Sequence, residues 1–142
     1  MPEAPITHRG YVTPAECDHM GHLNVAHFVK KFDQSTWNMF ADLGLNRQYL
    51  EDAGIVLAAV EQTFTYKREL MPGDVVTIRT EVLELAGKKI RFRHEMVESV
   101  SGESAAVAMN LALCVDAKTR KTRPFPDEVI AGARARLPEA AE

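Results

Sequence analysis

The chain has 142 residues, of which 46% are hydrophobic and 26% are charged, and this ordinary globular balance predicts one domain with a sizeable core. Its formal net charge of -3 argues against a general affinity for nucleic acid, and no apolar run is long enough to span a membrane. Residues 1–5 have no basic or apolar region of a signal peptide and are interpreted as a loose leader. The two cysteines, Cys17 and Cys114, match no disulfide framework or zinc pattern, so we expect a cytoplasmic protein.

The first half of the chain predicts one short strand followed by one long helix. Residues 6–13 alternate loosely and end at a proline, which predicts the strand. Asn24 is a good helix N-cap because its side chain can accept a hydrogen bond from the first turn, and Gly44 is a plausible stop. Between them the apolar residues keep helical spacing: Val25, Phe28, Val29, Phe32, Met39, Phe40 and Leu43. A short helical turn capped by Asn46 is expected next, ending at Gly54.

From Ile55 onward the hydrophobic period changes to two, which predicts consecutive strands. We expect them over residues 55–67, 75–82, 89–97 and 103–116, separated by turns at 71–74, 86–88 and 99–102. Hairpin-length turns between the last strands demand antiparallel neighbours. Asp127 is expected to cap a final helix to about residue 136, within a C-terminal helix and tail over 126–142. The fold class is therefore α+β, with an antiparallel sheet of about five strands against one long helix.

The segment between the first strand and the long helix is the most informative part of the chain. Together with the first turn of the helix, the run 16–28 gathers two acids, three histidines, a cysteine and an asparagine around one glycine. We interpret Asp18 as a chemical group, Gly21 as the point where the backbone turns sharply, and Asn24 as the start of the helix. A helix that begins here directs its free N–H groups and positive dipole end toward the Asp18 segment, where they can stabilise a developing negative charge.

The pattern Asp18-x-x-Gly21-His22-Leu23-Asn24 before a long helix resembles the 4-hydroxybenzoyl-CoA thioesterase-like family of hotdog-fold proteins. Tyr66 and the turn at 72–74 are also similar to that family. The resemblance spans roughly residues 6–125. It implies one hotdog domain over 1–142, with the sheet wrapped around a central helix, in homodimers joined edge to edge or homotetramers. It also implies acyl-CoA thioester hydrolysis without a cofactor, at active sites on the dimer interface.

Carried over to this chain, the resemblance makes Asp18 the catalytic nucleophile or general base, while backbone N–H groups near Gly21, His22 and Asn24 polarise the thioester carbonyl. The sequence departs from the family at Val25, where many members have a second asparagine, and at Phe28, where many have tyrosine. These departures leave the acyl group open. A turn or capping role for Asp18 is the non-catalytic alternative, and His22 could equally be a loop histidine that bonds backbone carbonyls.

Other candidate residues have weaker signals. Glu61 and Thr63 lie mid-strand, directed either to solvent or into a neighbouring subunit's site. Basic side chains could bind the phosphates of CoA, namely Arg68, Lys88, Lys89 and Arg91. His19 and His22 form a His-x-x-His pair, but no second ligand pair follows, so we expect no metal. Cys17 beside Asp18 is expected to have a raised thiol pKa rather than nucleophilic reactivity, and His94 is interpreted as a core histidine.

The sequence therefore predicts an acyl-CoA thioesterase that acts on a small or medium acyl-CoA or an aryl-CoA. Two alternatives stay open. One is a hotdog hydratase or dehydratase, which pairs an aspartate with a histidine in a different motif. The other is a non-catalytic module that binds acyl-CoA or an acyl carrier. Self-association is expected because an open sheet has edges that need covering.

Overall fold

The computed structural model describes residues 3–134 and contains a five-stranded antiparallel sheet with three α-helices, which confirms the expected α+β class. Its elements, in chain order, are β1 (Ile6–Tyr11), the 3-10 helix η1 (Pro14–Glu16), α1 (Val25–Asp42), α2 (Arg47–Ala53), β2 (Ile55–Tyr66), β3 (Val75–Ala86), β4 (Lys89–Glu98), β5 (Ser104–Asp116) and α3 (Asp127–Ala133). No helix within residues 3–134 is long and apolar enough to cross a membrane.

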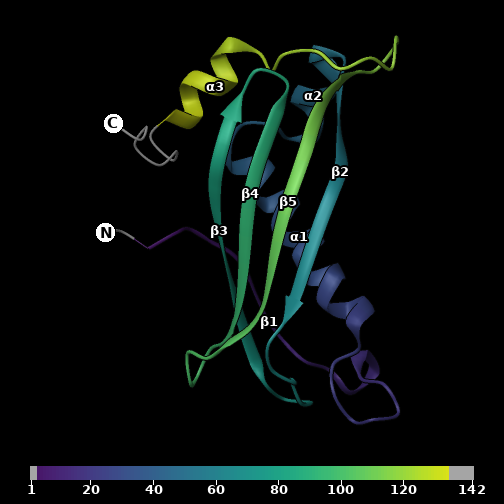
Figure 1. Ribbon diagram of the computed structural model, residues 1–142, viewed down its shortest axis with the longest axis vertical. Helices are drawn as coiled ribbons and strands as arrows, with labels where there is room; N and C mark the ends of the chain where they lie inside the picture. Colours follow the sequence, from purple (N-terminus) through teal and green to yellow (C-terminus); the bar gives the residue numbers. More distant parts are fainter. Residues whose placement is uncertain (1–2, 135–142) are drawn as a thin grey trace. The chain divides into compact units, whose positions relative to one another are not determined.

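The strands are ordered β1-β3-β4-β5-β2 in the sheet, and Figure 1 shows β3, β4, β5 and β2 running side by side. β1 pairs antiparallel with β3, with an irregularity in register between Ile6 and His8. The expected hairpin neighbours β3–β4 and β4–β5 are confirmed. β2 joins β5 rather than its sequence neighbour β3, a long-range pairing that the hydrophobic pattern did not predict.

The boundaries near the chain ends differ from the expected ones. β1 ends at Tyr11, two residues early, and β3 continues to Ala86. Asp127 is the first residue of α3 and not its cap, because Pro126 takes the N-cap position without a side-chain hydrogen bond. An acidic first residue still suits the positive end of a helix. Positions 1–2 of the expected leader (1–5) and positions 135–142 of the expected C-terminal helix and tail (126–142) lie outside the described residues.

The chain divides into two compact units, each with its own core. The first contains residues up to Asn38, together with Phe64–Thr80 and His94–Ala108. Its core joins α1 to the sheet through Val12, Leu23, Phe28, Phe32, Leu70, Val76, Ile78, Met96, Ala105, Ala106 and Ala108. The second contains Met39–Thr63, Glu81–Arg93 and the described residues from Met109 on, and its core includes Met39, Phe40, Leu43, Ile55, Phe92 and Phe125.

The apolar stripe predicted for α1 is buried at Phe28, Phe32, Met39, Phe40 and Leu43, half-buried at Val29, and exposed at its start, where the exposed fraction of Val25 is 56%. On β4 the alternate residues Ile90, Phe92, His94 and Met96 are all buried. The ring of His94 is bonded at both nitrogens, with Nδ1 2.6 Å from the hydroxyl of Thr80 and Nε2 2.8 Å from that of Thr36. Burial lowers the pKa of His94 to about 3. His94 is therefore a satisfied core histidine, as interpreted from the sequence.

Candidate active site

The segment between η1 and α1 is a closed loop held by its own backbone. Cys17 and Leu23 form an isolated antiparallel bridge across its neck. The N–H of Asp18 donates to the C=O of His22 over 3.1 Å, and the N–H of Gly21 donates to the C=O of Asp18 over 3.0 Å. Gly21 has φ of +85°, a left-handed conformation that glycine adopts at no steric cost. The sharp turn predicted at Gly21 is confirmed.

Asp18 uses one carboxylate oxygen within this loop. Its Oδ1 accepts a hydrogen bond from the backbone N–H of Met20 over 2.9 Å, which is the geometry of an Asx turn. The non-catalytic role considered from the sequence is therefore present in the structure. An Asx turn engages one oxygen and is compatible with chemistry at the other, so the catalytic role of Asp18 stays a prediction.

Asn24 determines which backbone N–H group at the start of α1 has no hydrogen-bond acceptor. Its Oδ1 accepts from the N–H of Ala26 over 2.9 Å, so the predicted N-cap is confirmed. Its C=O accepts from the N–H of His27 and of Phe28, over 2.9 and 3.2 Å. Within residues 3–134, the N–H of Val25 is then the donor of the first turn without a partner.

Val25 is a candidate that sequence reasoning missed, because its apolar side chain fitted the helical stripe. Its position at the first residue of the helix, rather than its side chain, could have identified it. The first N–H groups of a helix have no intrahelical acceptor, and an asparagine cap satisfies only the second or third of them.

A pocket of about 320 Å³ opens beside this donor. Two segments form its walls, 22–28 and 66–69, which the hydrogen bond from the N–H of Leu23 to the C=O of Leu70 (2.8 Å) holds together. The lining residues are His22, Leu23, Val25, Phe28, Tyr66, Lys67, Arg68 and Glu69. The pocket therefore combines an apolar wall with a charged rim, a combination typical of ligand sites.

Two aromatic rings form part of the apolar wall. The ring of Tyr66 meets that of Phe28 edge to face, with 5.2 Å between centroids. Burial raises the pKa of the Tyr66 hydroxyl, so this group is a neutral hydrogen-bonding group at physiological pH. On the rim, Nε2 of His22 lies 3.7 Å from a carboxylate oxygen of Glu69. His22 thus contributes its carbonyl to the Asp18 loop and its ring to the pocket.

Arg68 lines the pocket, but its guanidinium group already has partners. It lies 3.8 Å from Glu98 and 3.4 Å from Glu103, and it donates to the hydroxyl of Ser101 over 3.1 Å. Backbone hydrogen bonds from Val100 and Ser101 hold the pKa of Glu98 below its usual range. Arg68 is therefore a charge held at the rim, and its contact with CoA stays a prediction.

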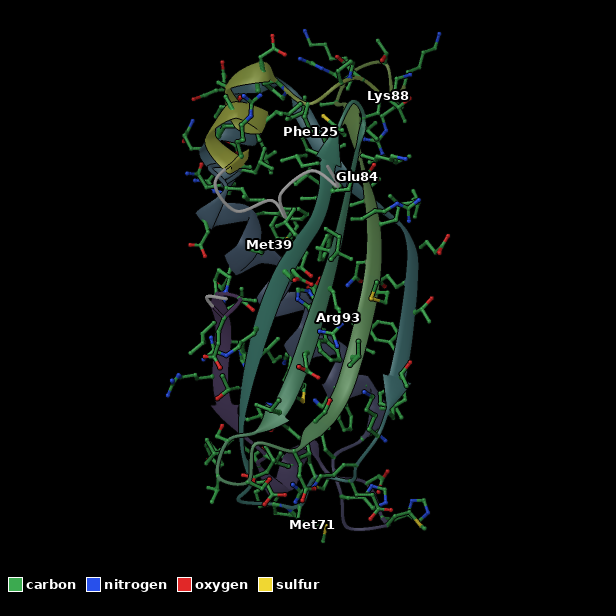
Figure 2. The ribbon with its side chains drawn as sticks, turned by 60° about the vertical axis from the view of Figure 1, so that its left-hand side comes forward. Met39, Met71, Glu84, Lys88, Arg93 and Phe125 are labelled. Atoms are coloured by element: carbon green, nitrogen blue, oxygen red, sulfur yellow. The ribbon has the colours of Figure 1, made fainter. Side chains whose placement is uncertain are left out.

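The other predicted CoA-binding residues belong to the second unit. Lys89 and Arg91 both lie near Glu84, at 3.6 and 3.3 Å. Lys88 is exposed in the turn between β3 and β4, and Figure 2 shows it at the same end of this unit as Glu84 and Phe125. Their proposed contacts with phosphate are untested.

Glu61 and Thr63 are exposed on β2, an edge strand of the sheet, and also belong to the second unit. Their expected role in substrate binding stays a prediction.

Cys17 is a poor nucleophile, as expected. Burial, followed by the neighbouring carboxylates of Asp18 and Glu16, raises the pKa of its thiol. The thiol points back to the C=O of Thr13 over 3.5 Å. A raised pKa keeps the sulfur protonated and therefore unreactive.

Comparison with known proteins identifies the family. Residues 12–132 match the family model described as the thioesterase-like superfamily. A betainyl-CoA thioesterase of Pseudomonas aeruginosa is 27% identical over 135 residues, covering 95% of this chain and 85% of that protein. The long-chain acyl-CoA thioesterase FadM of Escherichia coli is 23% identical over 127 residues, covering 89% and 92% of the two chains.

A Staphylococcus aureus protein solved in complex with CoA has a similar structure, with a TM-score of 0.86 and 21% identity, over 100% of this chain and 92% of that one. This likeness confirms the expected hotdog fold.

Proposed function

The chain belongs to the thioesterase-like superfamily and is an acyl-CoA thioester hydrolase, and on this premise we propose that it cleaves a small or medium acyl-CoA, or an aryl-CoA, with Asp18 as the catalytic carboxylate. The observation that carries the proposal is the free N–H of Val25, which lies at an apolar pocket beside the Asp18 loop. The acyl groups in the names of the two relatives differ, so the acyl class rests on the modest volume and aromatic wall of this pocket.

Hydrolysis in this site needs a donor for the carbonyl oxygen and a carboxylate for the carbonyl carbon. We assign the donor to the N–H of Val25, where the α1 dipole adds a favourable field for the oxyanion. Asp18 either attacks the carbon and releases CoA thiolate, forming a mixed anhydride that water hydrolyses, or it removes a proton from an attacking water. Because Oδ1 of Asp18 is held by Met20, the chemistry is assigned to Oδ2.

The surrounding residues receive supporting roles. Gly21 lets the loop close, His22 shapes the pocket mouth, and Asn24 holds the start of α1 so that Val25 is left free. Tyr66 and Phe28 contact the acyl group. The phosphates of CoA are proposed to meet the basic groups Arg68, Lys88, Lys89 and Arg91.

Self-association is part of the proposal. β2 is a twelve-residue edge strand whose central residues are exposed, and an unpaired edge offers N–H and C=O groups to a second copy. A homodimer or homotetramer would cover it, and Glu61 and Thr63 would then approach the neighbouring subunit. The two free cysteines, Cys17 and Cys114, support a reducing, cytoplasmic site of action.

The test is thiol release from a panel of aryl, short, branched, cationic and long-chain acyl-CoA thioesters. Asp18→Asn is the decisive variant, because an asparagine oxygen can still accept from Met20 N–H and keep the turn while the carboxylate is lost. We expect its turnover to fall by at least about 100-fold with an unchanged fold. Asp74→Asn is the matched control, since Asp74 also accepts a backbone N–H, that of Met71 over 2.8 Å, and we expect normal turnover there.

Full activity of Asp18→Asn would overturn the assigned mechanism. Loss of the conjugated double bond of an enoyl-CoA without thiol release would indicate a hydratase. Tight binding of every thioester without turnover would indicate a binding module, or a substrate carried on a protein.

A further inference from the structure

We propose that the partly buried ion pair between Lys31 of α1 and Glu16 of η1 positions the Asp18 loop for catalysis. This inference rests on the proposed function for its catalytic consequence, and on the geometry of the first unit for the positioning itself. The charged groups of both residues are taken up by each other and by Thr13 and Tyr11, so both are positioning residues and not catalytic ones.

Lys31 is a charged residue at a buried position of α1. Its side chain is only 7% exposed, and its ammonium lies 3.1 Å from Oε2 of Glu16. The same ammonium is 3.4 Å from the C=O of Tyr11. A buried ammonium is costly unless it is paired and hydrogen-bonded. Lys31 therefore ties α1 to both ends of the segment 11–16, which leads into the Asp18 loop.

Glu16 connects the ion pair to Thr13 and Asn24 through further hydrogen bonds. Its other carboxylate oxygen, Oε1, accepts from the backbone N–H of Thr13 over 2.8 Å and from the Thr13 hydroxyl over 3.1 Å. Its C=O accepts from the N–H of Asn24 over 3.0 Å. Burial opposes the charge on Glu16, but the hydrogen bonds from Thr13 and Lys31 outweigh it and lower the pKa of the carboxyl. Glu16 is thus held as an anion at its place.

The two groups of the proposed mechanism lie on either side of this anchor. Asp18 follows Glu16 by two residues. Val25 directly follows Asn24, whose backbone N–H donates to the C=O of Glu16. The Cys17–Leu23 bridge closes the loop directly after the anchor. A shift of Glu16 would therefore move Asp18 and the N–H of Val25 relative to each other, and displacements near 1 Å are enough to reduce turnover strongly.

Two imidazoles face the ion pair. Nδ1 of His27 lies 4.0 Å from Oε2 of Glu16, and His8 interacts electrostatically with both Lys31 and Glu16. Burial, followed by the charge of Lys31, lowers the pKa of His8. Burial and Lys31 therefore both disfavour a positive charge on His8 beside the ion pair.

The experiment compares Lys31→Met, Glu16→Gln, the double variant and Lys31→Arg. We expect Lys31→Met to lower kcat by about tenfold or more, with KM within about twofold. Lys31→Arg keeps the positive charge and is expected to recover most of the lost kcat. Because the two residues act as one unit, the double variant should be no slower than Lys31→Met alone. If Lys31→Met does not fold, Glu16→Gln and the double variant carry the comparison.

Hydrogen exchange of the peptide 16–24, measured by mass spectrometry, reports the positioning independently of activity. Lys31→Met should accelerate exchange there by at least about tenfold. The control Leu85→Ala removes core contacts in the second unit, and should lower stability while leaving kcat and this peptide unchanged. Normal exchange or normal kcat in Lys31→Met would overturn the inference. Accelerated exchange in a protein whose wild type releases no thiol would instead refute the proposed function and leave the positioning intact.

Discussion

The backbone N–H of Ala26 donates to the side-chain oxygen of Asn24 over 2.9 Å, and this bond leaves Val25 with the free donor at the start of α1. Asn24→Ala should therefore cost about 1 kcal/mol of stability and also lower kcat, because the freed N–H of Ala26 loosens the first turn. Asn24→Asp keeps an acceptor and should retain the stability. Urea unfolding and thiol release measure the two effects.

The second helix provides the matched control. Asn46 also caps its helix with its side-chain oxygen, which accepts from the N–H of Tyr49, the third residue of α2, over 2.8 Å, whereas Asn24 accepts from the second residue of α1. Asn46→Ala should lose a similar amount of stability and keep its kcat. Equal kcat in Asn24→Ala and Asn46→Ala would contradict the proposed role of Val25.

Gly21→Ala should be destabilising by about 1–2 kcal/mol, because φ of +85° is unfavourable for a residue with a Cβ. No atom lies within 4 Å of the added Cβ, so the cost is backbone strain alone. Gly102, with φ of +76° and equally open space, is the comparison. The midpoint temperature of thermal unfolding should fall similarly in both alanine variants, whereas kcat should fall only for Gly21→Ala. A loss of kcat in both would indicate a general effect of stability.

Stability should rise with pH between about 3 and 6.5 because of His94. Its native pKa is about 3, while an unfolded histidine titrates near 6.5, so the unfolded chain binds more protons throughout this window. The slope reaches roughly 1.4 kcal/mol per pH unit at most, and its stabilising effect is fully present above the upper limit. Burial also lowers the pKa of His8, which acts in the same direction.

Urea unfolding at several pH values tests this contribution. His94→Leu should flatten the slope and also lose about 1–3 kcal/mol at neutral pH, because the hydroxyls of Thr36 and Thr80 lose their partner. An equally steep slope in His94→Leu would show that other groups cause it.

Tyr66 should affect substrate binding through its ring rather than its hydroxyl. Tyr66→Phe keeps the contact with Phe28, which spans 5.2 Å between centroids, so KM should stay within about twofold. Tyr66→Ala loses an aromatic contact worth about 0.5–1.5 kcal/mol in addition to the free energy of burying the apolar area of the ring. KM should therefore rise roughly three- to tenfold. The measurement is KM over a series of acyl chain lengths, and an unchanged KM in Tyr66→Ala would remove this residue from the acyl site.

Local chemistry allowed much of the fold to be predicted. Asn24 and Asn46 mark helix starts through their own side chains, and Gly54 ends α2 in a left-handed conformation. The period-two alternation of β4 identified its buried face, including His94. Each of these features depends on residues within a few positions of one another, so it can be recognised without the rest of the chain. The same holds for Gly21 in the Asp18 loop.

By itself, the sequence determined the identity and order of the strands and α-helices, the turn at Gly21 and the cap at Asn24. Only the tertiary structure decided that β2 pairs with β5, that Lys31 meets Glu16, and that Arg68 is held by Glu98 and Glu103. Caps and turns are fixed by local backbone geometry and short-range hydrogen bonds. Strand partners and partly buried ion pairs join residues that are distant in the chain, and they follow from how the whole fold buries its apolar surface.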